Sequence, residues 1–145
     1  MFKKILVPTD GSKLSEKAVK RAVQLAKQSN ASISAVHVIP KFHTFTYQSD
    51  MLELTAKEYE ASASAKAKDY LGYVDRVAKA ADVKCNSDFS FSDQPFQEII
   101  KSAQKNKCDL IVMASHGRRG IEGFLLGSET QKVLTHSSVP VLVLR

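Results

Sequence analysis

Glycines and hydroxyl side chains gather in one segment of this chain, between an apolar run and an amphipathic pattern. The segment begins with ASHGRRG at residues 114–120, directly after LIVM at 110–113, and ends with GSETQ at 127–131. Glycines let backbone N–H groups approach an anion closely, and a helix N-terminus offers unpaired donors with a partial positive charge. A strand, a glycine loop and a helix start in this order predict a phosphate site. Nucleotide binding is therefore the central hypothesis.

The charge of the chain does not favour nucleic acid as a partner. The 145 residues carry a formal net charge of +6, which could attract a polyanion. Basic residues between positions 13 and 27 recur at helical spacing among apolar Leu14, Ala18 and Leu25, which is typical of a solvated helix face. No aromatic residues are interleaved with them as in a nucleic-acid-binding surface. We expect no nucleic-acid partner.

No apolar segment is long enough for a signal-peptide core or a membrane span. The first apolar run, Ile5-Leu6-Val7, stops at Pro8. Cys85 and Cys108 form neither a CxxC motif nor a disulfide framework, so both are expected to be small buried hydrophobes in a reducing compartment. These observations predict a cytoplasmic protein without a membrane partner.

Short apolar runs alternate with helical patterns along the chain. Strands are predicted at 2–7, 32–39, 83–90, 109–114 and 139–144, and helices at 13–28, 51–81, 93–106 and 128–136, with a loop at 41–49. Ser12 and Asp93 are expected to cap the first and third helices. Ser128, followed by Gln131 in a capping-box pattern, is expected to cap the fourth, and Gly72 could interrupt the second.

This alternation, with nearly continuous apolar strands, predicts one α/β domain over residues 1–145. Its parallel sheet would be covered by helices on both faces. Ligands of such sheets bind at the carboxyl ends of the strands, where the winding direction reverses. Two strand ends carry suitable chemistry: PTDGS at 8–12 and the glycine loop after the fourth strand. They share a crevice only if these two strands are neighbours, which periodicity does not establish.

Several segments, taken in order and spacing, resemble the universal stress protein family over essentially the whole chain. They lie at 5–12, 36–38, 109–117, 127–128 and 138–143. The resemblance implies an open, doubly wound, five-stranded parallel sheet of order 3-2-1-4-5. This is a Rossmann-like fold of the adenine nucleotide alpha hydrolase type, in which the first and fourth strands are adjacent. It also implies a homodimer formed through the last strand, from Val139 to Leu144.

The family contains members that bind ATP and members that do not. The binders resemble Gly-x2-Gly-x9-Gly-Ser/Thr, and Gly117, Gly127 and Ser128 match the later positions at the right spacing. Ala114 replaces the first glycine, and this added Cβ matters only if the position needs a positive φ or touches the ribose. The resemblance favours ATP as the cofactor, with any Mg²⁺ arriving through the phosphates.

The resemblance also implies roles for individual residues. The phosphates would be contacted, mostly through backbone N–H groups, by Gly117, Gly127, Ser128, Glu129 and Thr130. The adenine pocket would be lined by Pro8, Thr9 and Val38. The ribose or the adenine edge would be approached by Met113 and Ala114. Asp10 would accept a ribose hydroxyl or orient a metal-bound phosphate, and His116 would lie near the triphosphate. Arg118 and Arg119 could pair with phosphates.

Most of these positions also have an interpretation that needs no ligand. Ser128 could only cap its helix, and Asp10 could form an Asx turn with Gly11. Met113 and Val38 could be core residues at strand ends. Loop arginines are more often simply solvated. The resemblance favours a functional role for Asp10.

Different classes of function remain open. The first is a small ATP-binding stress-response protein with at most slow hydrolysis, since no GxSxG elbow, Walker loop or metal-ligand spacing of histidines is present. The second is a nucleotide-free, dimeric interaction module. The third is an adenylate-handling enzyme that uses Asp10 or His116 in catalysis. Adjacent Ser115 and His116 are not expected to have the geometry of a nucleophile and its base.

Overall fold

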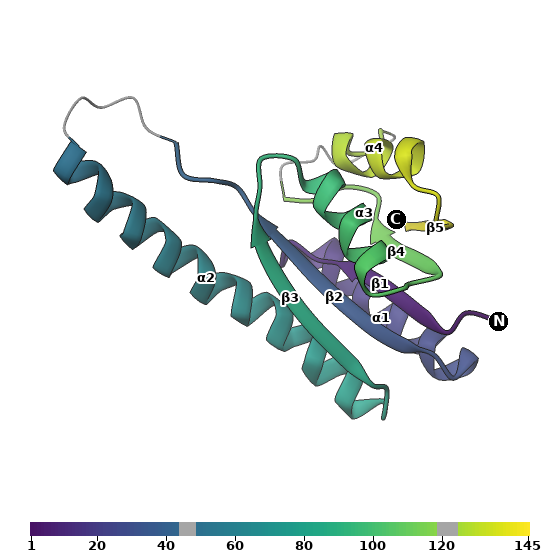
Figure 1. Cartoon of the computed structure of the whole chain (residues 1–145). Helices are drawn as coiled ribbons and strands as arrows, with labels where there is room; N and C mark the ends of the chain where they lie inside the picture. The colour runs from purple at the N-terminus through teal and green to yellow at the C-terminus, as the bar shows by residue number, and fades with distance from the viewer. Residues whose placement is uncertain (44–48, 119–124) are drawn as a thin grey trace.

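The computed structural model describes residues 1–43, 49–118 and 125–145, with side chains except those of 49–54. Strands and helices alternate along the chain (Figure 1). In order they are β1 (Lys4–Pro8), α1 (Lys13–Ser29), β2 (Ser32–Ile39), α2 (Ser49–Ala80), β3 (Cys85–Phe91), α3 (Pro95–Lys105), β4 (Leu110–Ala114), α4 (Ser128–His136) and β5 (Val141–Leu144).

The five strands form one parallel sheet in the order β3-β2-β1-β4-β5 (Figure 1), as predicted. The central strand β1 pairs on both sides, with Ile5 opposite Ile33 of β2 and Leu110 of β4. The adjacency of the first and fourth strands is therefore confirmed. Because parallel strands end at the same edge of a sheet, the segments after β1 and β4 begin side by side.

Two apolar layers hold the helices to the sheet. Strand residues alternate between faces, so Ile5 and Val7 pack with buried residues of α1 and α2, whereas Leu6 packs with buried residues of α3 and α4. Ile5, Leu6 and Val7 have no exposed surface. This double burial explains why β1 is an apolar run rather than an alternating pattern.

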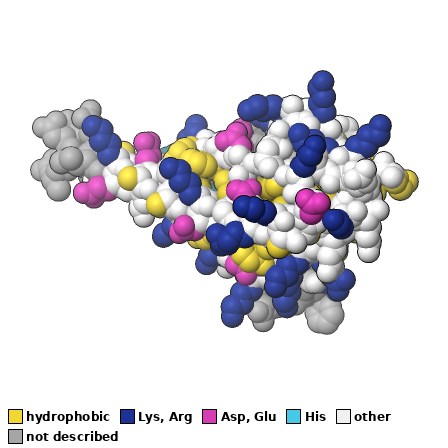
Figure 2. Space-filling model, turned by 90° about the horizontal axis from the view of Figure 1, so that it is seen from below, with side chains coloured by type: hydrophobic (Ala, Val, Ile, Leu, Met, Phe, Trp, Pro, Cys, Tyr) yellow, Lys and Arg dark blue, Asp and Glu magenta, His cyan; other side chains and the backbone are white. Residues whose placement is uncertain are grey.

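The first helix follows its sequence pattern closely. Ser12 accepts a hydrogen bond from the Ser15 backbone N–H, with 3.2 Å between Oγ and N, so the predicted cap is confirmed. The basic side chains of α1 are exposed, and its apolar side chains face the sheet. Seen from below, Lys and Arg are spread over the surface with Asp and Glu among them, rather than gathered in one patch (Figure 2).

The second helix is continuous, so the interruption proposed at Gly72 is wrong. Ala67, Leu71, Val74 and Ala78 recur at helical spacing and are all buried. Their burial outweighs the roughly 1 kcal/mol that a glycine costs in a helix interior. Residues 44–48 of the predicted loop lie outside the described residues.

The cap predicted at Asp93 is also wrong. Gln94 occupies the N-cap position of α3 and makes no side-chain capping bond. Asp93 instead accepts from the Lys41 backbone N–H, with 3.1 Å between Oδ1 and N, and its Oδ2 lies 2.6 Å from Nε2 of His43. A capping side chain must be free to accept a hydrogen bond from the helix backbone. Both carboxylate oxygens of Asp93 instead contact Lys41 and His43.

Three strands, β1, β3 and β5, begin two residues later than predicted. The β3 strand begins at Cys85 because Asp82 has a left-handed φ of 58° and the Val83 N–H still bonds to Ala78 O of α2. The β5 strand begins at Val141, because the Val139 N–H bonds to Ser137 Oγ and Pro140 has no N–H to donate.

The two cysteines differ in burial. Cys108 is buried as predicted, but Cys85 is only partly buried because β3 is an edge strand. Desolvation, with the nearby Asp75 carboxylate, raises the pKa of the Cys85 thiol to about 12, so this thiol stays protonated at neutral pH. Over the part of the chain that is described, no helix has the length and apolar character to cross a membrane.

Candidate functional site

A cavity of about 700 Å³ lies at the carboxyl ends of β1, β2 and β4. Its other walls are the start of α4, the first residues of α3 and one face of α2. Parallel α/β sheets place ligands at this edge. The cavity is lined by every site residue predicted from the sequence and described in the structure: Pro8, Thr9, Asp10, Val38, Met113, Ala114, His116, Gly117, Arg118, Gly127, Ser128, Glu129 and Thr130.

The start of α4 presents unpaired backbone donors to this cavity. Gly127 is the N-cap of α4, and no side chain caps this helix, so the cap and capping box predicted at Ser128 are wrong. The N–H groups of Ser128, Glu129 and Thr130 have no hydrogen-bond acceptor among the described residues. Three such donors at the positive end of a helix suit an anion. Gln131 donates through Nε2 to Leu126 O instead of completing a capping box.

Gly127 permits the close approach of α4 to the end of β4. Its N–H donates to the Ser115 carbonyl, with 2.7 Å between N and O. A Cβ at Gly127 would lie 3.2 Å from His116 Cα and 3.3 Å from Ser115 O, both backbone atoms that cannot rotate away. Any larger residue would push the donors of α4 away from the strand end.

Asp10 joins the turn after β1 to the glycine loop. Its Oδ1 accepts from the Ser12 N–H at 2.9 Å, so the Asx turn considered for this residue is present. Its Oδ2 accepts from the Arg118 backbone N–H at 2.7 Å. A Cβ at Gly117 would overlap this Oδ2. Glycine is therefore needed at 117 to let the Asp10 carboxylate reach the loop.

The Arg118 side chain, for which a phosphate contact or simple solvation was considered, has partners within the protein. Its Nε donates to Asp10 O at 3.0 Å and its Nη2 to Gly11 O at 3.1 Å. The guanidinium carbon lies 5.3 Å from the ring centre of Tyr70 on α2, a cation–π distance. Arg118 thus fastens the glycine loop to both β1 and α2. Arg119 lies outside the described residues.

Two buried threonines fix the strand ends. Thr9 Oγ1 accepts from Ser15 Oγ at 2.7 Å and from the Gly11 N–H at 3.2 Å. Thr130 Oγ1 donates to Ala114 O at 3.0 Å. These hydroxyls are used within the protein, so the threonines would serve a ligand mainly through shape and backbone groups.

The end of β2 leaves backbone groups facing the cavity. The Thr9 N–H donates to Val36 O at 2.9 Å, and β1 ends opposite Val36 at Pro8. Backbone groups alternate in direction along a strand, so the N–H and C=O of Val38 point to the same side as those of Val36, where β1 has already ended. The Val38 side chain packs against the α3 and α4 layer. Val38 therefore contributes core packing, and its backbone N–H and C=O lie beyond the end of β1.

Sequence analysis missed His37, which also lines the cavity. Its Nδ1 lies 2.7 Å from Thr9 O, and because a carbonyl can only accept, we assign the proton to Nδ1. The ring meets Tyr70 edge-on, with centroids 5.1 Å apart. Burial lowers the pKa of His37, so the ring is neutral at pH 7 with its Nε2 lone pair available.

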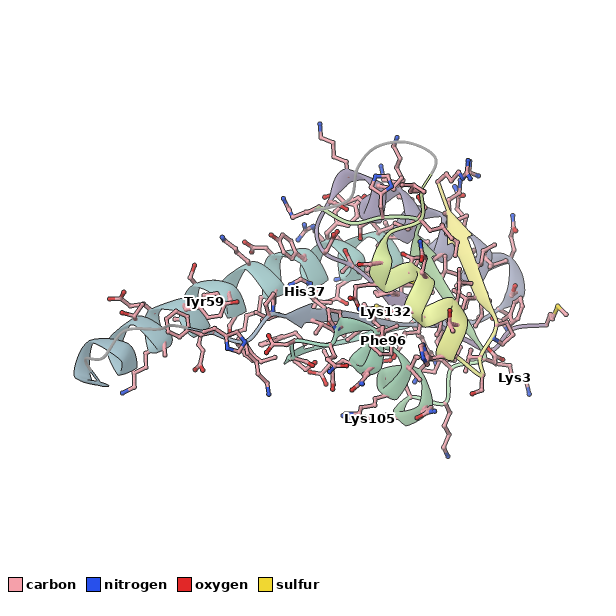
Figure 3. All side chains as sticks on the ribbon, turned by 90° about the horizontal axis from the view of Figure 1, so that it is seen from above. Lys3, His37, Tyr59, Phe96, Lys105 and Lys132 are labelled. Carbon is pink, nitrogen blue, oxygen red and sulfur yellow. The ribbon has the colours of Figure 1, made fainter. Side chains whose placement is uncertain are left out.

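One face of α2 was missed as well. Its cavity-lining residues recur every three or four positions and are Tyr59, Ser62, Ala63, Lys66 and Tyr70. Figure 3 shows Tyr59 on α2 and His37 on β2. Helical periodicity predicted that Tyr59, Ala63 and Tyr70 share one face of a helix. It did not predict that this face lines the cavity.

Comparison with known proteins assigns the family. The family model described as "Universal stress protein family" matches residues 1–145. The chain belongs to the universal stress protein family. Universal stress protein MJ0531 of Methanocaldococcus jannaschii is 33% identical over 100% of this chain and 83% of its own length.

Solved structures of other universal stress proteins share the fold. UspA from Lactobacillus plantarum has a TM-score of 0.85 at 27% identity, over 99% of this chain and 97% of that chain. A universal stress protein in complex with cAMP has a TM-score of 0.71 at 27% identity, again over 99% and 97%. At the first glycine of the Gly-x2-Gly-x9-Gly-Ser/Thr pattern, this universal stress protein has Ala114. Ala114 is not among the residues with a positive φ.

The Ser115 and His116 side chains are in contact, but only His116 lines the cavity. Ser115 Oγ lies 3.3 Å from His116 Nδ1, so these neighbours do contact each other. Ser115 is buried and does not line the cavity, whereas His116 does. Among the residues whose side chains are described, no group of three or more His, Cys, Asp or Glu could hold a metal ion.

Proposed function

We propose that the cavity binds an adenine nucleotide, with ATP as a ligand and Mg²⁺ arriving through its phosphates. The proposal depends above all on one arrangement: the unpaired N–H groups of Ser128, Glu129 and Thr130 share a cavity with Val38, whose backbone lies beyond the end of β1. The first set suits a phosphate and the second suits the edge of a base. A volume of about 700 Å³ is in the usual range for small-molecule sites.

The end of β2 favours adenine over guanine. The Val38 carbonyl can accept from the N6 amino group of adenine, whereas guanine presents the O6 acceptor at that position. The apolar wall beside it includes Val38, Ile99 and Met113, which suits the face of a base. A universal stress protein of this fold has been solved in complex with cAMP, which is an adenine nucleotide and supports the same ligand class here.

The test is to identify and then titrate the ligand. Mass spectrometry of the denatured protein is expected to find a released adenine nucleotide. Calorimetric titration of stripped protein is expected to give an affinity for ATP at least about tenfold higher than for GTP, because a mispaired buried polar group costs roughly 1–3 kcal/mol. Absence of binding for both nucleotides would overturn the proposal and favour the nucleotide-free interaction module.

Asp10 and His116 are not arranged for efficient catalysis at this site. The Asp10 carboxylate is engaged by two backbone N–H groups, and the His116 ring contacts Ser115. We expect at most slow ATP hydrolysis by this site. Turnover that disappears in both Asp10→Ala and His116→Ala would instead support the adenylate-handling enzyme.

We also propose a homodimer through β5. This strand is an edge of the sheet, so its outer backbone groups have no partner strand within the described chain. Leu142 on β5 and Leu134 on α4 are each 41% exposed. Antiparallel pairing with a second β5 would satisfy the edge and cover apolar surface.

The dimer predicts a specific effect of charge at this edge. Leu142→Lys is expected to shift the protein from dimer to monomer in sedimentation experiments, because two lysines would face each other across a two-fold axis. Binding of ATP to the same variant provides the control for folding. A wild-type protein that sediments as a monomer at all concentrations would contradict the dimer.

A further inference from the structure

Glu129 places a fixed negative charge beside the candidate phosphate site. Its Oε2 accepts from the Phe96 backbone N–H at 2.9 Å, and its Oε1 lies 3.3 Å from Nζ of Lys132. Figure 3 shows Phe96 on α3 next to Lys132 on α4. The Glu129 carboxylate contacts both of these residues. The Glu129 side chain is 35% exposed and tied at both oxygens, so it cannot turn freely into solvent.

This carboxylate occupies the first turn of α4, the same turn that offers its N–H groups to the cavity. A negative side chain in the first turn is stabilised by the positive end of the helix. The carboxylate therefore weakens the electrostatic attraction between the positive end of α4 and a bound phosphate. The backbone donors of the turn remain available for hydrogen bonds to a phosphoryl oxygen.

Among the described residues, the cavity lining has fewer cations than carboxylates. The charged side chains among its described lining are the cations Lys66 and Arg118 and the carboxylates Asp10, Asp93 and Glu129. Arg118 already donates to the carbonyls of Asp10 and Gly11. A long, highly charged phosphate chain would thus meet more carboxylates than cations among the described lining residues.

We propose that Glu129 makes this site selective by charge: adenine nucleotides with little negative phosphate charge bind best, and metal-free triphosphate is disfavoured. The favoured ligands are those with one phosphodiester or monophosphate group, and triphosphate whose charge is reduced by Mg²⁺. The inference rests on the proposed function and adds which adenine nucleotides the site accepts. Glu129 acts as a specificity-determining residue, because the repulsion from its charge grows with the negative charge of the ligand.

The test variant is Glu129→Gln, which removes the charge but keeps an oxygen that can accept from Phe96. The matched control is Glu98→Gln. Glu98 is also a first-turn acid, on α3, and pairs with Lys101 three residues later at 3.2 Å, but it does not line the cavity. Both variants lose one negative charge from the protein, so a general effect of net charge appears in both.

Affinities for cyclic AMP, AMP and ATP are measured by calorimetry, with EDTA and then with excess Mg²⁺. In the wild type, Mg²⁺ is expected to strengthen ATP binding and to leave cyclic AMP nearly unchanged. Glu129→Gln is expected to strengthen metal-free ATP binding about tenfold, the size of one partly screened charge–charge interaction at short range. The gain for cyclic AMP is expected to be smaller, and Glu98→Gln is expected to change neither affinity.

Two outcomes would overturn the inference while leaving the proposed function intact. One is an equal change in the affinities for ATP and cyclic AMP in Glu129→Gln. The other is wild-type affinity that rises steadily from AMP to ADP to ATP in EDTA, a measurement that needs no variant. If no adenine nucleotide binds to either protein under any condition, the proposed function itself fails, and this inference with it.

Discussion

Gly127→Val is expected to abolish adenine nucleotide binding, with a loss of affinity of at least about a hundredfold. Even a Cβ at this position would lie 3.2 Å from His116 Cα and 3.3 Å from Ser115 O, and valine adds two more methyl groups. The start of α4 must then move away from the end of β4. Its three donors would leave the positions that suit a phosphate, and hydrogen bonds to an anion weaken steeply with distance and angle. Calorimetric titration with ATP and Mg²⁺ measures the effect.

Gly72→Ala provides the matched control for this prediction. A Cβ at Gly72 would meet only Nη1 of Arg76, at 3.3 Å, and the long arginine side chain can move. We expect unchanged nucleotide affinity and a gain in stability of up to about 1 kcal/mol, because alanine is the better helix former. Near-normal nucleotide affinity in a folded Gly127→Val protein would contradict the phosphate site at α4.

The largest expected effect on stability is that of Gly11→Ala. Gly11 has a φ of +75°, a conformation that costs residues with a Cβ roughly 1–2 kcal/mol. The new Cβ would also overlap the ring of Tyr70. That ring is held against His37 and Arg118, with 5.1 Å between ring centroids and 5.3 Å from the ring centre to the guanidinium carbon. It cannot move without disturbing the wall of the cavity.

We expect Gly11→Ala to lower the free energy of unfolding by about 3 kcal/mol and the melting temperature by roughly 10 °C. Chemical denaturation followed by circular dichroism measures the first quantity. Repeating the substitution in a Tyr70→Ala background separates the two causes. The cost of Gly11→Ala should fall there to that of the positive φ alone. An equal cost in both backgrounds would show that overlap with Tyr70 contributes nothing.

The elements of the fold were largely predictable because their signals are local. The apolar runs of β1 and β4 and the helical spacing of α1 depend on residues close together in the chain. The Ser12 cap spans three residues, and it was predicted correctly. The caps predicted at Asp93 and Ser128 were wrong. Asp93 is held by Lys41 and His43, which lie about fifty residues away, whereas Gly127 itself takes the capping position of α4.

The candidate site was predictable in the segments that follow strands. The turn after β1 and the glycine loop were identified from residue types alone, and their meeting at one cavity required the order of the strands, which the resemblance implied and the structure confirmed. His37 and the cavity-facing side of α2 were not identified. A histidine in a strand and tyrosines on a helix carry no signal of what lies opposite them.

The sequence by itself determined where strands, helices and glycine turns occur, because torsional preference and apolar periodicity act over a few residues. Only the tertiary structure decided that Asp10 receives the Arg118 backbone N–H, that Tyr70 supports the turn at Gly11, and that Glu129 is anchored to α3. Each of these contacts joins residues from about thirty to more than one hundred positions apart. Such pairs are set by how whole elements pack, and packing depends on the shape of every side chain between them.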